Sequence, residues 1–373
     1  MAKDMQHAYR MVVKLGTSTL TNGEKNLSAP RIVDLARQIS LLRADGFQMI
    51  LASSGAIAAG REVLGFPALP KHLPAKQMLA AVGQPRLMAL YEQVFTIYKQ
   101  RVAQVLLTRA DLVDRRRFLN ARNTLEALLH QGVLPIVNEN DTVATDEIRF
   151  GDNDNLSAQV ANLVEADLLV LLTDQGGLYT ADPRRDPSAR LIREVGPEPF
   201  SEALLLAARG SSNGLGTGGM MTKLQAAELA RRSGTTVVIA LGSEADVLLR
   251  LARGEDMGTR LLPAVNKLEA RKRYILSSCQ AGDELVVDAG AARALAHGGS
   301  LLPAGLLRVA GDFERGDTVR ILGQDGRAVA AGMASYPVAD LEQLCGKQSS
   351  EIEVVLGYTF GDEVVHRNNM VLL

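Results

Sequence analysis

Two short runs of carboxylate and amide side chains are the residues of this chain best suited to chemistry. One is the Gly-Asp-Asn-Asp-Asn run at Gly151–Asn155, and the other is Asn138–Asp141. Asn and Asp compete for backbone hydrogen bonds, so neither run fits a helix or strand interior, and we predict two loops. Each run follows an apolar segment, and polar loops at the ends of buried strands hold ligands in α/β folds.

Side chains of this kind can bind Mg²⁺ or the ammonium group of a substrate. The candidates are Asp141, Asp152, Asn153 and Asp154. Mg²⁺ prefers few carboxylates together with phosphate oxygens, so we assign no protein residue to a metal site. An isolated acidic loop is usually only solvated, and that alternative stays open, but two such loops around one strand-and-helix unit favour a binding site.

Two lysines far apart in the sequence could supply positive charge. Lys14 follows the apolar run Met11–Val13 in a loop of Gly, Thr and Ser. The backbone N–H groups of such a loop suit phosphate oxygens, and the lysine adds a point charge. Lys223 ends a glycine-dense run that begins at Gly214. Taken alone, a lysine after a strand is more often a solvated loop residue.

Two further segments could bind an anion at the start of a helix. Gly214–Gly219 formally contains G-x-G-x-x-G, but residues 202–209 before it look helical, whereas a dinucleotide-binding motif needs a strand there. The P-loop pattern also fails, so we predict a flexible loop that covers phosphates, with a mobile surface linker as the alternative. Ser53–Gly55 opens the helix that follows the apolar run at residues 47–52, and it could bind an anion or simply cap that helix.

None of the five histidines neighbours any of these motifs. Phosphoryl transfer to a carboxylate needs no general base, because a carboxylate with a pKa of ~4.3 is already ionised at pH 7. The obstacle is repulsion between the anionic nucleophile and ATP. Two lysines, backbone amides and Mg²⁺ can lower that repulsion by positioning and charge stabilisation.

The elements that must position these residues alternate between apolar runs and segments of helical periodicity. We predict strands at residues 11–13, 47–52, 102–107, 133–137, 168–172 and 236–240, and helices that include residues 118–129, 156–164 and 222–232. This alternation predicts an α/β fold, an open, mostly parallel sheet sandwiched by helices. Short β-like runs at 284–287, 305–309, 317–321 and 329–331 predict a small β-rich C-terminal domain. We expect domains at residues 1–265 and 278–373, divided near the charged stretch Arg271–Arg273.

Composition excludes several other classes of protein. The net charge of −1 over 373 residues gives no global field that would favour nucleic acid or an anionic membrane. Cys279 and Cys345 lack metal-ligand spacing, so we expect two reduced thiols. The N-terminal residues lack an apolar signal core, and the longest apolar run is too short to span a bilayer. We therefore expect a cytoplasmic protein without membrane contact.

An ordered set of motifs resembles the amino acid kinase family, through about residues 10 to 260. The motifs are Val12–Ser18, Ser53–Gly60, Leu106–Asp111, Phe118–Arg122, Asn138–Asp141, Gly151–Asn155, Leu172–Gln175 and Thr217–Lys223. They are most similar to the members that phosphorylate L-glutamate. The resemblance implies ATP-dependent phosphorylation of the glutamate side-chain carboxylate to glutamyl 5-phosphate, for proline biosynthesis. It also implies Mg²⁺, feedback inhibition by proline, and a dimer or tetramer.

The same resemblance implies roles for individual residues. Lys14 and Lys223 would stabilise the transferring phosphoryl group, and Asp154 would orient both lysines. The residues implied for glutamate are Ser54, Gly55, Asp141 and Asn153, with Asp152 and Asn138 nearby. Those implied for ATP are Lys14, Thr173, Asp174, Thr217, Gly218, Gly219, Met220, Met221, Thr222 and Lys223. Two departures are Ser53, where Thr is common, and Met221, where a small hydroxyl residue is frequent.

The segment from about residue 278 to 370 resembles a PUA domain, through Gly290–Leu295, Ser300–Gly305, Val309–Asp317 and Gly361–Asn368. Such domains bind RNA elsewhere, but no dense basic face is visible here, so a structural or regulatory role is favoured. Two other functions stay open. One is a related kinase acting on aspartate, acetylglutamate, carbamate or a nucleotide, although the pair Asp141 and Asp152 favours a free α-amino group. The other is an RNA-binding protein, whose affinity would fall steeply with salt.

Overall fold

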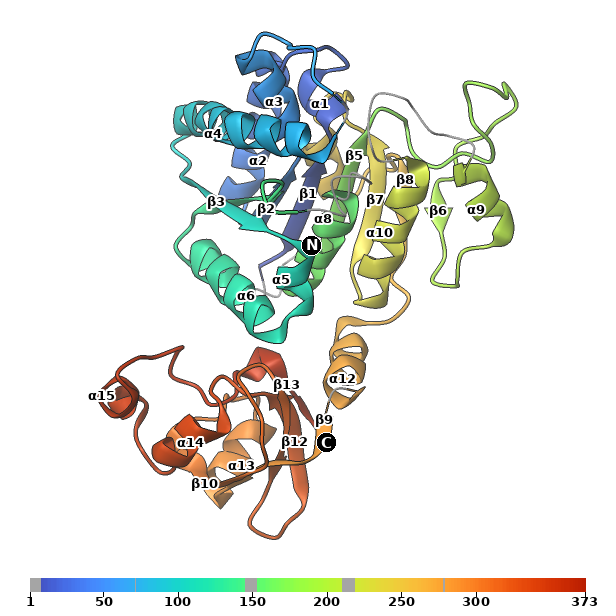
Figure 1. Ribbon diagram of the computed structural model, residues 1–373. Helices are drawn as coiled ribbons and strands as arrows, with labels where there is room; N and C mark the ends of the chain where they lie inside the picture. Colours follow the sequence, from blue (N-terminus) through green and yellow to red (C-terminus); the bar gives the residue numbers. More distant parts are fainter. Residues whose placement is uncertain (1–7, 71, 145–152, 210–218, 278) are drawn as a thin grey trace. The chain divides into compact units, whose positions relative to one another are not determined.

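The computed structural model describes residues 8–70, 72–144, 153–209, 219–277 and 279–373. The chain divides into two compact units, which Figure 1 shows in ribbon form. The first unit comprises Met1–Val113 and Asn120–Lys267, and the second comprises Asp114–Leu119 and Leu268–Leu373. No sequence pattern predicted that Asp114–Leu119, at the start of one helix, would belong to the second unit. In the described part of the chain, no helix is long and apolar enough to cross a membrane.

The first unit is built on an eight-stranded sheet with the order β3-β4-β2-β1-β5-β7-β8-β6. In that order, the strands are Val102–Leu107, Leu134–Glu139, Gln48–Ser53, Arg10–Leu15, Leu168–Thr173, Thr236–Leu241, Thr259–Leu261 and Glu194–Val195. All neighbouring pairs are parallel except β7 and β8. The predicted fold class and the six predicted strands are confirmed. The short strands β6 and β8 were not predicted, because two or three residues show no periodicity.

Helices lie on both faces of this sheet (Figure 1). Those of the first unit are α1 (Thr17–Thr21), α2 (Ala29–Ala44), α3 (Ala56–Val63), α4 (Leu73–Ile97), α5 (Arg109–Val113), α6 (Arg115–His130, shared with the second unit), α8 (Asn153–Leu163), α9 (Glu202–Arg209), α10 (Met220–Arg232) and α11 (Val247–Ala252). Met11, Val13 and Leu15 of β1 pack into one core with α2, α4 and α11. Because side chains alternate along a strand, Lys14 faces the opposite side, where α8 and α10 lie.

Two predicted loops are in part regular structure. Asn138 and Glu139 are the last residues of β4, and Asn153–Asn155 form the first turn of α8. The loop prediction is therefore wrong for these residues. The first turn of a helix tolerates Asn and Asp because its N–H groups lack intrahelical partners, and a carboxylate there also meets the favourable end of the helix dipole. Asn138 is accommodated at the strand end because its amide forms hydrogen bonds with the side chains of Gln84 and Asn153.

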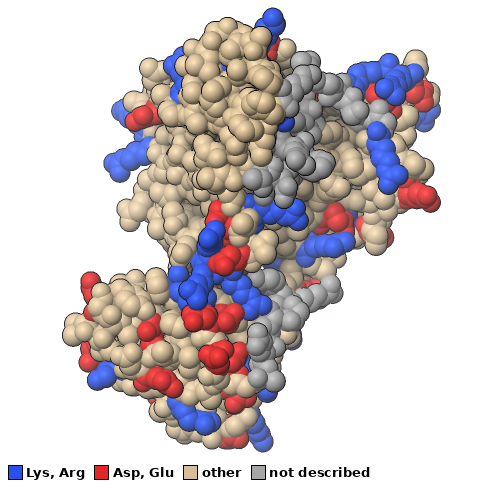
Figure 2. Space-filling view, in the orientation of Figure 1, with Lys and Arg blue, Asp and Glu red and all other residues tan. Residues whose placement is uncertain are grey.

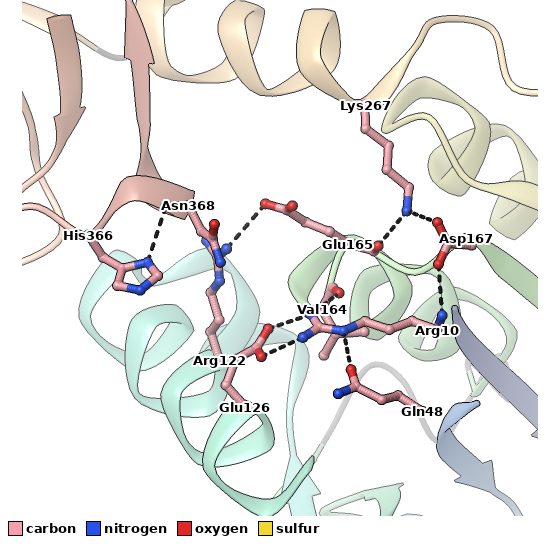
Figure 3. Close-up of polar contacts among 10 residues, drawn as sticks. All are labelled: Arg10, Gln48, Arg122, Glu126, Val164, Glu165, Asp167, Lys267, His366 and Asn368. Atoms are coloured by element: carbon pink, nitrogen blue, oxygen red, sulfur yellow. Dashed lines mark hydrogen bonds and ion pairs between the residues drawn. The ribbon is translucent and has the colours of Figure 1, made fainter. Parts of the chain in front are cut away.

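A partly buried ion network holds the strands at the end of the sheet where β1 and β5 begin (Figure 3). The Arg10 guanidinium forms a bidentate pair with Glu126 of α6, at 2.5 and 2.7 Å. The backbone N–H of Arg10 donates to Asp167 Oδ2 at 2.7 Å, and Lys267 Nζ lies 2.5 Å from Asp167 Oδ1. Lys267 begins α12 (Lys267–Ser277), so the last residue of the first unit is fixed to the loop before β5.

The second unit has its own five-stranded sheet, with the order β10-β9-β11-β12-β13. These strands are Leu306–Ala310, Cys279–Val287, Thr318–Leu322, Ala328–Met333 and Met370–Leu372. With α13 (Ala289–Ala296), α14 (Val338–Leu344) and α15 (Ile352–Leu356), they enclose a separate core that includes Leu285, Phe313, Ile321 and Tyr336. The predicted β-rich C-terminal domain is confirmed. The charged stretch Arg271–Arg273 lies within α12, which the sequence analysis did not predict.

Candidate active site

The carboxyl ends of β1, β2, β4 and β5 meet at one edge of the sheet, because the four strands are parallel neighbours. Lys14 lies near the end of β1, and Ser54 directly follows β2. Asn138 lies near the end of β4, and Thr173 ends β5. This edge is where open α/β sheets bind their ligands. Residues that are far apart in the sequence are thus brought to one place.

Asp154 lies between the two predicted lysines. Lys14 Nζ is 2.6 Å from Asp154 Oδ1, and Lys223 Nζ is 3.2 Å from Asp154 Oδ2. The Thr222 hydroxyl lies 2.8 Å from the same Oδ2. Asp154 has no exposed surface, and each lysine side chain is only 8% exposed. The three charged groups therefore form one buried cluster in which a single carboxylate holds two ammonium groups.

Burial and charge oppose each other at this cluster. Burial alone would raise the pKa of Asp154, but the ammonium groups of Lys14 and Lys223 outweigh it, so the pKa lies below its ordinary value. Burial lowers the pKa of Lys14, and the Asp154 carboxylate opposes that shift. One carboxylate cannot neutralise two ammonium groups, so the cluster keeps an excess positive charge when both lysines are protonated. An anionic group such as phosphate would complete it.

A second cluster consists of the amides of Asn153 and Asn138 and the hydroxyl of Ser54. It adjoins the first cluster because Asn153 directly precedes Asp154 in the chain. Asn153 Nδ2 donates to Ser54 Oγ at 2.9 Å and to Asn138 Oδ1 at 3.3 Å. Asn153 Oδ1 is buried and has no hydrogen-bond partner among the described residues. A buried acceptor without a partner is unfavourable unless a ligand donor satisfies it, so this oxygen is a candidate contact for a substrate ammonium.

The anion and capping interpretations of Ser53–Gly55 can now be separated. The N-cap of α3 is Gly55, with a φ of 103°, and no side chain caps the helix. The simple capping alternative is therefore wrong. Ser53 Oγ lies 2.7 Å from the buried Tyr91 hydroxyl, whereas Ser54 is directed to Asn153. The positive φ explains why glycine stands at position 55, since other residues rarely adopt it.

Asp141 lies in the turn after β4. Burial raises the pKa of Asp141 to about 6, although the positive charge of Lys76 on α4 acts in the opposite direction. Gln77, the next residue of α4, donates to the carbonyl of Ala144 at 3.1 Å and so holds the same turn. A half-buried carboxylate with a raised pKa gains most from an incoming cation, which fits the predicted contact with a substrate ammonium.

The residues predicted for ATP are only partly described. Gly219 is the N-cap of α10, and Met220–Lys223 form the first turn of this helix of 13 residues, whose free N–H groups suit a phosphate. The Thr173 hydroxyl donates to Asp174 at 3.1 Å. A hollow next to these elements is lined by Gln175, Leu178, Tyr179, Ala181, Pro183, Leu204, Ala207, Ala208 and Met220. Asp152, Thr217 and Gly218 lie outside the described residues.

Sequence reasoning missed one residue that contacts this site. Gln84 of α4 accepts a hydrogen bond from Asn138 Nδ2 at 2.8 Å. It was missed because it lies within a helix of mostly apolar residues and outside every motif. The run Gly83-Gln84-Pro85, a polar residue between two poor helix formers, was the available signal.

Comparisons with known proteins agree with this geometry. Residues 9–241 match the model of the "Amino acid kinase family", and residues 283–356 match the "PUA domain". The glutamate 5-kinase of Shewanella amazonensis is 54% identical over 374 residues, covering 100% of this chain and 98% of that protein. The chain belongs to the amino acid kinase family, in its glutamate 5-kinase branch.

One more glutamate 5-kinase supports this placement in the branch, and one solved structure supports the fold. The glutamate 5-kinase of Deinococcus radiodurans is 54% identical over 365 residues, covering 98% of this chain and all of that protein. A solved structure, the carbamate kinase from Giardia lamblia bound to AMP-PNP, has a TM-score of 0.50 and 19% identity, over 69% of this chain and 99% of that one. The likeness to this carbamate kinase structure supports the fold alone, whereas the two glutamate 5-kinases define the branch.

Proposed function

We propose that the protein transfers the γ-phosphoryl group of ATP to the side-chain carboxylate of L-glutamate, which yields L-glutamyl 5-phosphate for proline biosynthesis. The observation that carries this proposal is the buried cluster of Lys14, Lys223 and Asp154 next to the amide cluster of Asn153. The first cluster suits phosphate, and the second suits an ammonium group. The full-length similarity to glutamate 5-kinases names the substrate that joins these two requirements.

The reaction needs charge stabilisation more than proton transfer. A glutamate carboxylate oxygen attacks the γ-phosphorus, the bond from that phosphorus to the β-phosphate oxygen breaks, and ADP leaves with the bonding electrons. Both reactants are anionic, so Lys14 and Lys223 lower their repulsion and stabilise the charge on the equatorial oxygens. Asp154 holds both ammonium groups in place. No histidine is required, because the nucleophile is already ionised.

ATP would reach this site as its magnesium complex. Within the described ranges, no group of three or more His, Cys, Asp and Glu side chains is arranged to hold a metal ion. The carboxylate of Asp154 is occupied by two lysines, so it is a poor ligand for a second cation. Mg²⁺ held mainly by phosphate oxygens fits this arrangement and would neutralise charge on the leaving ADP.

Glutamate would be held by its ammonium group at the amide cluster. Asn153 Oδ1 offers a buried acceptor, and Asp141 offers a carboxylate. N-acetylglutamate lacks the ammonium group, and aspartate is one methylene shorter. Proline keeps the α-carboxylate and a charged amine, so we propose it as an inhibitor at or overlapping this site. We also propose a cytoplasmic location and a homodimer or homotetramer, in keeping with the family resemblance.

The test of the function is ATP-dependent acyl phosphate formation, trapped with hydroxylamine. Mg²⁺ and either L-glutamate, L-aspartate or N-acetylglutamate are supplied to the full chain. We expect hydroxamate with L-glutamate, at least about 100-fold less with the other two, and suppression by proline. Signal with another substrate alone would overturn the specificity, and no signal with any would overturn the kinase assignment.

Glutamate binding is expected to weaken in mild acid. The pKa of Asp141 lies at about 6, so the carboxylate that attracts the ammonium is lost below that pH. We expect kcat/KM for glutamate to fall about tenfold per pH unit below pH 6. Measurements from pH 5 to 7 avoid protonation of glutamate itself. An Asp141→Asn variant should have a high KM and lack this pH dependence, and a flat wild-type profile over this range would contradict the role.

The same shift affects stability. The folded protein holds the Asp141 proton more tightly than the unfolded chain, whose pKa is near 3.8. The stability that comes from protonated Asp141 is therefore fully present below pH 3.8, and it is lost as the pH rises from there through the folded pKa of about 6. At pH 7 we expect Asp141→Asn to raise the melting temperature of the unliganded protein while it weakens glutamate binding.

The face of the second unit that Figure 2 shows gives no specific support for RNA binding. Acidic and basic side chains are interspersed on the face of this unit that Figure 2 shows. Nucleic-acid-binding domains instead gather lysines and arginines on one face or along one helix. A structural or regulatory role for this PUA-like unit stays our prediction.

A further inference from the structure

We propose that Gln84 and Asn138 are positioning residues that fix the direction of the Asn153 amide, so that its oxygen faces the α-ammonium of the bound amino acid. This inference rests on the proposed function and adds a determinant of substrate recognition. It concerns three amides that come from three elements, α4, β4 and α8. Each amide could in principle be turned by 180°, which would exchange its donor and acceptor. A partner that can act only as a donor or only as an acceptor is needed to fix which way each amide points.

The direction is decided by a backbone group that can only donate. The N–H of Glu139 donates to Asn138 Oδ1 at 2.9 Å. A backbone N–H has no acceptor alternative, so Asn138 must present its oxygen on this side. Asn138 Nδ2 is then directed to the other side, where it donates to Gln84 Oε1 at 2.8 Å. Asn138 is only 2% exposed, so water cannot readily replace either partner.

Asn138 passes this direction on to Asn153. Its Oδ1 also accepts from Asn153 Nδ2 at 3.3 Å, and the second Nδ2 hydrogen of Asn153 goes to Ser54 Oγ at 2.9 Å. Both donors of Asn153 are thereby used inside the protein. Its acceptor, Oδ1, is buried and has no partner among the residues that the structure describes. The chain of bonds thus leaves an oxygen available at the site, which suits a hydrogen-bond donor, most strongly a charged ammonium, and disfavours an anionic group.

Gln84 is held where it can support Asn138. A Cβ atom on Gly83 would lie 1.8 Å from the carbonyl oxygen of Ala56, and one on Gly60 would lie 1.9 Å from that of Leu79. Only glycines permit α3 and α4 to pack this closely. This contact places the Gln84 amide over the end of β4. The Gln84 Nε2 group donates to Gln104 of β3 at 2.9 Å, so its oxygen remains directed at Asn138.

This assignment changes the role expected of Asn138. The resemblance placed Asn138 near glutamate, but three of its four hydrogen-bonding positions are used by protein groups. It therefore acts on the substrate through Asn153. If Gln84 no longer accepts, the buried Nδ2 of Asn138 loses its partner, and Asn138 can turn away from the position that orients Asn153.

The test compares Gln84→Leu with Gln84→Glu and with Gln93→Leu, the same substitution on an exposed position of α4. For each full-length protein, KM for L-glutamate, KM for ATP and kcat are measured. The inhibition constant of glutarate, which is glutamate without its amino group, is measured alongside. We expect Gln84→Leu to raise KM for glutamate about tenfold, the loss typical of one weakened bond to a charged group.

The other quantities distinguish positioning from general damage. Gln84→Leu should leave the glutarate inhibition constant, KM for ATP and kcat within about twofold, since only recognition of the ammonium is altered. Gln84→Glu keeps an acceptor for Asn138 and should restore KM to within about threefold, and Gln93→Leu should match the wild type. If Gln84→Leu does not fold, Gln84→Met replaces it.

Two outcomes would overturn the proposal. One is an unchanged KM for glutamate in Gln84→Leu, and the other is a parallel weakening of glutarate, which would mean a general distortion. Both outcomes leave the kinase function intact. If the wild type forms no glutamyl phosphate at all, the proposed function fails instead, so the two failures can be told apart.

Discussion

Replacing Lys223 with methionine is expected to lower kcat by about 10³-fold, while KM for L-glutamate changes by less than about threefold. The ammonium of Lys223 is held by Asp154, whereas the amide cluster expected to bind glutamate is held together by Asn153. Its charge matters most when the phosphoryl group is in transit, and an interaction made mainly in the transition state appears in kcat. Steady-state kinetics by hydroxamate formation measure both constants.

Methionine keeps most of the volume of this buried side chain, so the variant should fold. Lys347→Met, an exposed lysine of the second unit, is the matched control and should retain wild-type kinetics. An unchanged kcat in Lys223→Met would remove Lys223 from the catalytic machinery. A rise in KM for glutamate without loss of kcat would instead place this lysine at the substrate.

Asp154→Asn is expected to reduce both stability and activity strongly. The substitution leaves two buried ammonium groups next to each other without a carboxylate. Breaking a buried ion pair by removing one partner costs about 3–5 kcal/mol. We expect a fall in melting temperature of roughly 10 °C and a loss of kcat of at least about 100-fold, since both lysines lose their orientation.

ATP provides an internal control for the Asp154→Asn variant. Its phosphates would supply negative charge to the same lysines, so MgATP should raise the melting temperature more in the variant than in the wild type. The lowered pKa of Asp154 also predicts how the stability of the folded protein depends on pH. Its charge contributes stability above the ordinary Asp pKa of 3.8, and this contribution is lost as the pH falls toward the folded pKa. The variant should lack this acid-sensitive component, and an unchanged melting temperature would contradict the role of Asp154.

Part of this site could be predicted from residue types and spacing. Apolar runs that end in Lys14, in Asn138 and in Thr173 place these side chains at one edge of a parallel sheet, because parallel strands have their carboxyl ends together. The glycine-dense approach to Lys223 and the helix after it were likewise readable. The change to short β-like runs near the C-terminus likewise predicted the separate β-rich domain. Local propensity and periodicity determine these features, and the chain needs no distant contact to express them.

The tertiary structure decided which of these side chains meet. Asp154 and Lys223 are 69 positions apart, and Ser54 and Asn153 are 99 apart, so their contacts depend on how α8 and α10 pack on the sheet. Asn153–Asn155 form the first turn of α8, where Asn and Asp are tolerated, although the sequence analysis predicted a loop there. The role of Gln84 depends on the glycine contact between α3 and α4. The sequence by itself determined the elements and the chemical groups. Only packing decided the charge balance and the direction of each amide, since burial and partners come from residues that are remote in the chain.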